Sequence, residues 1–444
     1  MLPRYTRPAF RDLWSEGNKK QAWLEVELAF LSARVTLGGL PPEAYDAIKK
    51  HAKLNLARQD QLEAEYKHDM IAFVKDIQMS LEEAGVGQYA SEFHKLLTSY
   101  DIEDPAIVTL LRQAIIMIQN EFTSLQYALR AKARKHKWTL MIMRTHGQFA
   151  EPGTFGHLLL VFAEAVKRSW NRLQFVLDND LSEGKISGAV GNFPGLDPNM
   201  AALALDLLNL KPAKAETQIL QRDRFAAVIS AVALATATIE QICRTFWEMM
   251  RSDVGELQEP RGKNQRGSSR MAYKKNPILT EQEQGIARLE RGYLIAAFEN
   301  VATPECRDIS QSCVERVIFP DATTLLDYAT AKLTKMVEGL VVFPERMREN
   351  LDKTYGVWAA QPIRDALMES GVSYDEAYEY LQRCGFDAAE LQRPLMDFMK
   401  QPISEKSPCS AVDVLGVERL LSFFDPKAYV EKGTEYIFKN EPAT

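Results

Sequence analysis

Two long runs without glycine or proline limit the folds open to this chain. Residues 106–144 and 213–254 contain neither residue. In the first run, apolar side chains recur at the spacing of one helix face, at Ile107, Leu110, Leu111, Ala114, Ile115, Ile118, Phe122, Leu125 and Leu129. At 1.5 Å per residue, unbroken helices of this length would measure roughly 55–60 Å each, which is typical of a helical bundle. Because strand patterns are few and weak, the sequence predicts an all-α fold with a central long-helix bundle.

The second run contains a segment that is apolar on nearly every face of a helix. Residues 229–239 read ISAVALATATI. A helix that is apolar all round must be buried on all sides. In a soluble chain this pattern predicts the centre of a bundle, shared with other subunits. Shorter helices are expected at about residues 156–181, 278–301 and 322–342.

The regions on either side of the long runs have a different character. A smaller helical region, including residues 19–37, precedes Pro105. After about residue 361, shorter amphipathic segments are interrupted by glycine and proline, at Gly371, Gly385, Pro394 and Pro402. At 444 residues the chain is also too long for one ordinary core. We therefore expect three domains, at residues 1–104, 105–364 and 365–444.

Composition and charge exclude several classes of function. The net charge is −6 and basic residues are spread along the chain, which argues against nucleic acid as a partner. Five cysteines form an odd set without a C-x-x-C pair, as expected of reduced thiols in the cytosol. The first residues, MLPRYTRPAFRDLW, lack an apolar signal core, and no stretch reaches 18 uninterrupted apolar residues. We expect a soluble, cytoplasmic protein without a membrane segment.

The common signatures of metal and nucleotide cofactor sites are missing. The six histidines form no H-E-x-x-H or other zinc spacing. The chain also lacks G-x-G-x-x-G, G-x-x-x-x-G-K-[ST] and G-x-S-x-G patterns. No metal and no cofactor is predicted.

One loop combines serine and basic residues in a way that suits proton removal from an anion. Residues 267–281 read GSSRMAYKKNPILTE and lie between two long apolar-periodic segments. The cationic side chains would bind an anionic substrate and favour a deprotonated serine. The same composition also fits a solvated surface loop, so the rest of the chain must decide between the two.

Three other breaks between helices carry polar residues of the same kind. Residues 67–73 (KHDMIAF) contain His68 and Asp69, and residues 94–101 (HKLLTSYD) precede the first long run. Residues 144–156 (RTHGQFAEPGTFG) place His146 between two helices. Each histidine by itself is explained by structure or solvation, and Thr98 and Ser99 by helix capping. Four such breaks in one chain favour a shared catalytic site.

The breaks match three motifs of one family in their expected order. They are Thr98-Ser99-Tyr100-Asp101, the T-H-G-x-x-A-E-P motif at residues 145–152, and a G-S-S-x-M-P-x-K-x-N-P type motif at residues 267–277. Further matches are RYTRP at 4–8, KISGAVGNF at 185–193, TQILQRDR at 217–224 and RDISQSCVER at 307–316. Over essentially its whole length, the chain resembles the adenylosuccinate lyase family of the fumarase/aspartase superfamily.

The resemblance implies β-elimination of fumarate from a succinyl-amine. The two substrates implied are adenylosuccinate, which gives AMP, and the succinyl-carboxamide imidazole ribotide, which gives AICAR. By motif position, Ser268 is the expected base and His146 the expected general acid. Lys274 and Asn276 are expected to hold the succinyl carboxylates, and Glu281 to orient His146. No cofactor is implied.

The resemblance also implies the remaining site residues and the assembly. By motif position, His68 is expected to act both in catalysis and in positioning the substrate. Further expected substrate-binding positions are Asp69, His94, Thr98, Ser99, Thr145, Gln218 and Ser269. The 5′-phosphate is expected to lie among Arg4, Tyr5, Arg307, Ser312 and Arg316, since arginine makes bidentate contacts with phosphate. The family forms homotetramers in which each site is built from three subunits.

The chain departs from the family pattern at positions beside the expected catalytic groups. In the serine loop, Arg270 replaces a small residue and Ala272 a proline. Elsewhere the replacements are Leu96 for glycine, Tyr100 for serine or threonine, Gly153 for threonine, Phe225 and Gln311 for histidine, and Cys313 for serine. None removes a proposed catalytic group. They bear on rate, loop dynamics and specificity at the purine end.

Two alternatives to this function remain open at the level of sequence. A sister lyase would act on argininosuccinate or another succinyl-amine, although such a substrate has no phosphate for Arg4, Tyr5, Arg307 and Arg316 to bind. The second alternative is a helical tetramer with a structural or binding role and impaired activity.

Overall fold

The chain is mainly helical in the computed structural model, which describes residues 2–439 and 441. Within those residues, the β-structure consists of three two-stranded sheets and one isolated bridge between Pro402 and Ser410, so the predicted all-α fold is confirmed. By internal contacts the chain divides into two compact units. The first comprises Met1–Ser124, Val166–Gln241 and Gln282–Leu333, and the second Leu125–Ala165, Ile242–Glu281 and Thr334–Thr444. Because this division cuts across long helices, the domain boundaries expected at residues 104 and 364 stay a prediction.

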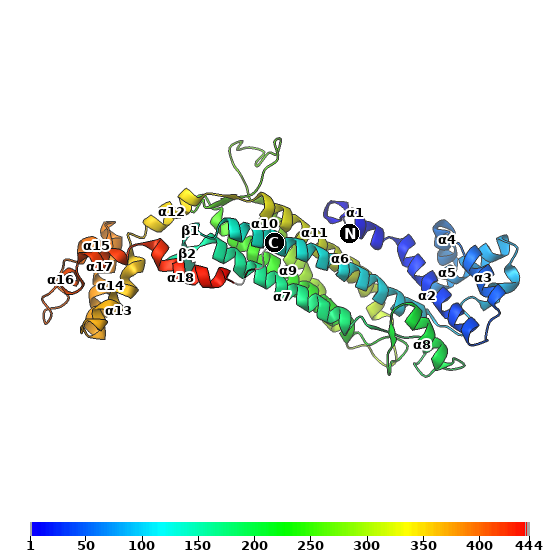
Figure 1. The fold of residues 1–444 in the computed structure, drawn as a ribbon. Helices are drawn as coiled ribbons and strands as arrows, with labels where there is room; N and C mark the ends of the chain where they lie inside the picture. The colour runs from blue at the N-terminus through cyan, green and yellow to red at the C-terminus, as the bar shows by residue number, and fades with distance from the viewer. Residues whose placement is uncertain (1, 440, 442–444) are drawn as a thin grey trace. The chain divides into compact units, whose positions relative to one another are not determined.

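Five long helices contribute residues to both units (Figure 1). They are α6 (Ser99–Lys135), α7 (Phe155–Asp178), α9 (Asp223–Met249), α10 (Ile278–Glu299) and α11 (Ser310–Gly339). The first unit adds η1 (Pro3–Tyr5), α1 (Pro8–Leu13), α2 (Glu16–Thr36), α3 (Pro42–His51), α4 (Leu56–Tyr66), α5 (Asp69–Glu83), η2 (Gly87–Glu92), β3 (Glu183–Gly184), α8 (Pro198–Leu207) and β4 (Lys211–Pro212).

The second unit adds a hairpin, a short sheet and the C-terminal helices. Its strands are β1 (Leu140–Thr145), β2 (Gln148–Thr154), β5 (Leu257–Gln258) and β6 (Val341–Val342). Its helices are α12 (Pro344–Asp352), η3 (Val357–Ala359), α13 (Ala360–Glu369), α14 (Tyr374–Leu391), α15 (Leu395–Phe398), α16 (Ala411–Leu415), α17 (Val417–Ser422) and α18 (Pro426–Phe438). The pairs β1–β2 and β5–β6 are antiparallel, whereas β3–β4 in the first unit is parallel.

The long helices differ in extent from the runs that predicted them. Helix α6 has 37 residues but begins at Ser99, so Pro105 lies inside it rather than at its start. Helix α9 has only 27 residues, because the chain before Asp223 is held out of a helix by contacts to α6. The backbone N–H of Leu220 donates to Asp104 Oδ2 at 2.7 Å, and Arg222 forms an ion pair with the same carboxylate. The expectation of one helix over residues 213–254 was therefore wrong at its N-terminal end.

The apolar centre of α9 is largely buried by its own chain. Ile229, Val232 and Ile239 are completely buried, while Leu234 is 47% exposed. Helix α9 is long and apolar enough to cross a membrane by length and composition, but 61% of the apolar window is buried inside the protein, as in a core helix. Burial of each large side chain contributes roughly 1.5–3 kcal/mol.

Aromatic packing joins the N-terminal helices of the first unit, which Figure 1 shows in blue. Trp23 of α2 lies edge-on to Phe73 of α5, with ring centroids 5.5 Å apart, and Phe73 also packs on Phe93. The buried carboxylate of Asp76 accepts hydrogen bonds from Gln59 and Asn55, which ties α4 to α5. These contacts place the start of α5 beside α2.

A β-hairpin that the sequence did not predict lies between α6 and α7. His146 and Gly147 form its two-residue turn, and both have left-handed backbone angles, with φ of 54° and 76°. A type I′ hairpin turn requires positive φ at both positions. The buried carboxylate of Glu256 accepts hydrogen bonds from Arg144 at 3.0 Å and Asn350 at 2.9 Å, which anchors the end of β1.

Candidate active site

The start of α6 organises the candidate site residues of the first unit. The backbone N–H of Thr98 donates to Asp101 Oδ2 at 3.0 Å, which caps the helix beside Ser99. The other oxygen of Asp101 accepts from Lys185 Nζ at 2.7 Å and from the backbone N–H of Ser187 at 2.9 Å. Asp101 is fully buried. The acidic residue of the first motif therefore holds the KISGAVGNF segment against α6.

Gln218 and Arg307 are brought together by the same framework. Lys185 Nζ also donates to the carbonyl oxygen of Gln218 at 2.9 Å. The side-chain oxygen of Gln218 accepts from Arg307 Nη1 at 3.0 Å. Two residues expected to bind substrate, from segments far apart in sequence, thus form one polar pair.

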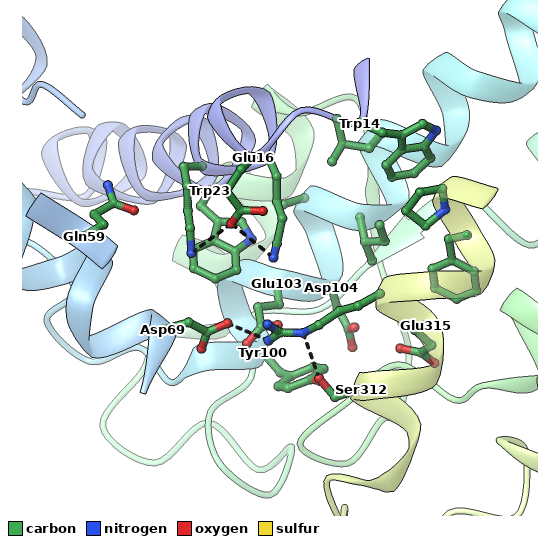
Figure 2. A pocket seen from close by; sticks show the side chains of 18 of the residues that line it. Trp14, Glu16, Trp23, Gln59, Asp69, Tyr100, Glu103, Asp104, Ser312 and Glu315 are labelled. Carbon is green, nitrogen blue, oxygen red and sulfur yellow. Dashed lines mark hydrogen bonds and ion pairs between the residues drawn. The ribbon is translucent and has the colours of Figure 1, made fainter. Parts of the chain in front are cut away.

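Arg316 lines a cavity, in which Figure 2 labels its neighbours Asp69, Glu103 and Ser312. Its guanidinium donates to Asp69 Oδ2 at 2.6 Å and to Ser312 Oγ at 3.3 Å, and lies 3.6 Å from Glu103. Burial opposes ionisation of Asp69, but the charge and the hydrogen bond of Arg316, together with the charges of Lys20 and Lys19, outweigh burial and lower the pKa of that carboxyl. The Arg316 side chain is 43% exposed, so an anionic ligand can reach it.

The cavity beside Arg316 has a volume of about 410 Å³ and carries charges that sequence analysis missed. Burial, and then the Asp69 charge, raise the pKa of Glu103 to about 7. Lys20 is 4% exposed, with its ammonium 3.6 Å from the centre of the Trp23 ring. Burial and the neighbouring Lys19 lower the pKa of Lys20. Lys20 and Trp23 lie on the buried face of α2. No sequence motif marks a buried lysine as part of a site, so Lys20 could not be predicted from the sequence.

The two histidines of the N-terminal region that are expected in the site, His68 and His94, have different environments. His94 Nδ1 lies 2.6 Å from Glu27 Oε1, and its backbone N–H donates to the same carboxylate at 3.2 Å. Burial acts to lower the pKa of His94, but the hydrogen bond to fully buried Glu27 and the charges of Glu27 and Asp101 together more than offset burial, so the pKa is raised. His68 occupies the position before α5, where its side chain is 45% exposed and Nδ1 is 3.7 Å from Asp69.

Arg4 and Tyr5 lie in η1, near the N-terminus. The Tyr5 ring packs edge-on against Tyr328 at 5.6 Å. Arg7 anchors the segment through ion pairs to Asp327 and Glu121. In the part of the chain that the structure describes, no hydrogen bond or ion pair joins Arg4 or Tyr5 to the other expected phosphate residues.

In the second unit, the serine loop closes on itself. Ser268 Oγ accepts hydrogen bonds from the backbone N–H groups of Met271 at 3.0 Å and Arg270 at 3.4 Å. The Asn276 side chain donates to the carbonyl oxygen of Gly267 at 2.8 Å. A Cβ at Gly267 would collide with the carbonyl oxygen of Lys274, so only glycine fits there. Backbone donors at Ser268 Oγ favour negative charge on that oxygen.

Lys274, Asn276 and Glu281 line a second cavity of about 640 Å³ beside this loop. Glu281 accepts a hydrogen bond from the Trp247 indole N–H at 3.3 Å. The carboxylate of Glu259, which sequence analysis missed, accepts from the backbone N–H groups of Leu279 and Thr280 and so caps α10. This capping role of Glu259 is visible only in the structure, because no sequence motif predicts it.

His146, Thr145 and Ser269 are exposed, and none is enclosed by this chain alone. Among the hydrogen bonds of the described residues, none joins His146 to Ser268 or to Glu281. The structure therefore gathers the expected residues into two groups. One surrounds Arg316 and Gln218 in the first unit, and the other surrounds Ser268 and Lys274 in the second.

The structure accounts for several departures from the family pattern. Tyr100 Oη lies 3.3 Å from Gln311 Nε2, so two of the replaced residues contact each other. The Phe225 ring packs on Phe319. Leu96 adopts φ of 73°, a left-handed conformation that favours glycine. At Gly153, a Cβ would lie 2.5 Å from the Met143 side chain, which fills the space of the usual threonine.

Comparison with known proteins places the whole chain among lyases. Residues 4–289 match the family described as Lyase. The chain is 36% identical to an adenylosuccinate lyase of Bacillus subtilis strain 168 over 439 residues, which is 99% of each protein.

Solved structures show the same fold. The fumarate lyase of Mesorhizobium sp. BNC1 has a TM-score of 0.88 and 24% identity, covering 99% of this chain and 100% of that one. The 3-carboxy-cis,cis-muconate lactonizing enzyme of Pseudomonas putida has a TM-score of 0.87 and 26% identity, covering 98% and 96%.

Proposed function

Because the chain belongs to the adenylosuccinate lyase family, a family of carbon–nitrogen lyases within the fumarase/aspartase superfamily, we propose that it releases fumarate from adenylosuccinate by β-elimination, giving AMP. The second substrate proposed is succinyl-aminoimidazole-carboxamide ribotide, which gives AICAR in purine biosynthesis. The structural observation that carries the proposal is the pair of backbone donors at Ser268 Oγ. They supply what a serine needs to act as a base beside a carboxylate substrate.

In this mechanism, Ser268 removes the proton next to a succinyl carboxylate. The carbanion is held as an aci-carboxylate, whose added charge Lys274 and Asn276 stabilise. His146 then protonates the departing nitrogen as the carbon–nitrogen bond breaks. In this structure Glu281 accepts a hydrogen bond from Trp247. In the assembled oligomer, Glu281 orients His146.

The nucleotide phosphate binds to the group around Arg316 and Arg307. Ser312 and Gln218 already contact these arginines, which supports one anion site at this place. A phosphate would replace Asp69 and Glu103 as partners of Arg316, since the guanidinium offers several donors. Arg4, Tyr5, His68, His94, Thr98 and Ser99 complete the substrate contacts. A succinyl-amine without phosphate, such as argininosuccinate, would leave the two arginines unused.

The complete site is shared among the subunits of a cytoplasmic homotetramer. Exposure of His146, Thr145 and Ser269 supports this assembly, because one chain does not enclose them. Large apolar side chains are also exposed on the long helices, at Ile116, Val161, Phe175, Leu234, Ile295 and Phe298. Such positions are typical of surfaces that pack against other subunits. We propose that each subunit of this tetramer has three domains, at residues 1–104, 105–364 and 365–444.

The test is ultraviolet absorbance of purified protein mixed with each purine substrate. We expect turnover by the unaltered protein and at least about a hundredfold loss of kcat in Ser268→Ala, as for removal of a catalytic base. Ser422→Ala, on exposed α17, is the matched control and should retain full activity. A folded protein that turns over neither substrate would disprove the proposed function. Full activity in Ser268→Ala would disprove only the assignment of the base.

A further inference from the structure

Tyr100 forms an aromatic surface beneath Arg307. It lies in the first turn of α6 and is only 3% exposed. The centre of its ring is 4.0 Å from the Arg307 guanidinium carbon and 5.5 Å from that of Arg222. At 4.0 Å the guanidinium is in direct cation–π contact with the ring. The residue type usual at this position, serine or threonine, could not make this contact.

Arg307 depends on this contact for its orientation. One end of its guanidinium donates to Gln218 Oε1 at 3.0 Å. Its Nε, by contrast, is shielded from solvent and has no hydrogen-bond partner among the described residues. A free arginine side chain has about 2 kcal/mol of rotamer entropy to lose before it can bind phosphate. The Tyr100 ring restricts that freedom where hydrogen bonding does not.

The ring is itself held in place from two sides. Its hydroxyl contacts Gln311 Nε2 at 3.3 Å and also hydrogen-bonds the Ser312 side chain, both at the start of α11. On the other side, Arg222 is fixed by ion pairs to Asp104 and Glu315, each at 3.0 Å. Burial raises the pKa of Tyr100 to about 12, so the hydroxyl stays neutral.

We propose that Tyr100 is a positioning residue that orients Arg307 toward the phosphate monoester of the nucleotide substrate. Gln311 assists by holding the Tyr100 hydroxyl. This inference rests on the proposed function and adds to it a residue that determines affinity for the phosphorylated end. Tyr100 acts through Arg307 and does not itself touch the reacting atoms.

The test compares phosphorylated and unphosphorylated ligands in Tyr100→Thr. We expect KM for adenylosuccinate, and the Kd for AMP measured by calorimetry, to rise about tenfold, as for loss of a partly desolvated cation–π contact. The values for the 5′-dephosphorylated substrate and for adenosine should change less than about twofold on the same reasoning. Tyr100→Phe, which keeps the ring, should recover most of the affinity. Equal losses on both kinds of ligand would overturn the proposal.

A double-variant cycle separates positioning from packing. In Arg307→Ala, the further change Tyr100→Thr should have no added effect on AMP affinity, whereas full additivity would overturn the proposal. Tyr45→Thr removes another ring that faces a cation, Lys49 at 5.5 Å on α3, and is the matched control. Circular dichroism and gel filtration identify variants that fail to fold, and Tyr100→Leu then replaces Tyr100→Thr.

Failure of the proposed function would give a different result. If the unaltered protein turns over neither purine substrate but binds AMP more tightly than adenosine in a Tyr100-dependent manner, the reaction is wrong and this inference stands. If AMP and adenosine bind the unaltered protein equally, the inference is overturned.

Discussion

Replacing Glu103 with glutamine should flatten the dependence of stability on pH. Glu103 lies in the cavity of Figure 2, with its side chain 15% exposed. The groups that face it are Asp69 on α5, Arg316 and Glu315 on α11, Lys19 on α2 and Asp104 on its own helix. Burial, and then Asp69, raise its pKa from 4.5 to about 7.

The sign and size of the effect follow from proton linkage. Below pH 4.5 the carboxyl is protonated in both the folded and the unfolded chain. Between pH 4.5 and about 7 the unfolded chain loses this proton first, so the free energy of unfolding falls as the pH rises. From pH 5 to 8 the loss amounts to roughly 2–3 kcal/mol, at about 1.4 kcal/mol per pKa unit. Glutamine has no proton to lose and should remove this contribution.

The assay is equilibrium urea unfolding at pH 5, 6, 7 and 8, at one protein concentration because the chain is proposed to be oligomeric. Relative to the unaltered protein, Glu103→Gln should gain stability from pH 5 to about pH 7 and little more between pH 7 and pH 8. Glu16→Gln is the control, since this carboxyl lines the same cavity but is 58% exposed. If Glu103→Gln and the unaltered protein lose the same free energy from pH 5 to 8, the reasoning is refuted.

Two further predictions concern backbone geometry. Leu96→Gly should raise the free energy of unfolding by about 1 kcal/mol, because glycine relieves the strain of a left-handed residue whose side chain is 46% exposed. Urea unfolding would show no gain if φ at Leu96 were not strained. Gly267→Ala should lower kcat by about tenfold or more, because the new Cβ meets the Lys274 carbonyl and displaces Ser268. Unchanged kcat in that variant would mean that the closed loop is not the active arrangement.

Helix periodicity is a local property, and the sequence predicted it well. The apolar spacing of residues 106–129 placed the body of α6 correctly. The errors occur at helix ends, where distant contacts decide. Asp104 binds Leu220 and Arg222, and these contacts keep the chain before Asp223 out of a helical conformation. Leu140–Thr145 has no glycine or proline and looked like a continuation of α6, but it pairs with β2 across the His146–Gly147 turn.

The candidate site shows the same contrast between features predicted from the local sequence and features set by distant contacts. Motifs supplied the residues proposed to contact substrate, such as Ser268, His146 and Arg316, because the proposed chemistry requires those residue types. The sequence contained no signal for the charges that support them. Glu27 holds His94 and Glu256 anchors Arg144; both carboxylates are completely buried and lie far from their partners in the sequence.

By itself, the sequence determined the all-α class, the long helices and the family chemistry of its serine and histidine motifs. These depend on the order of side chains along the chain, which is present before folding. Only the tertiary structure decided that Ser268 Oγ meets two backbone donors, that Glu103 shares Arg316 with Asp69, and that Tyr100 lies beneath Arg307. The Glu103 and Tyr100 contacts join segments far apart in the sequence, whereas the Ser268 contacts depend on the closed form of its own loop, which Asn276 holds. Burial then sets the strength of each charge interaction.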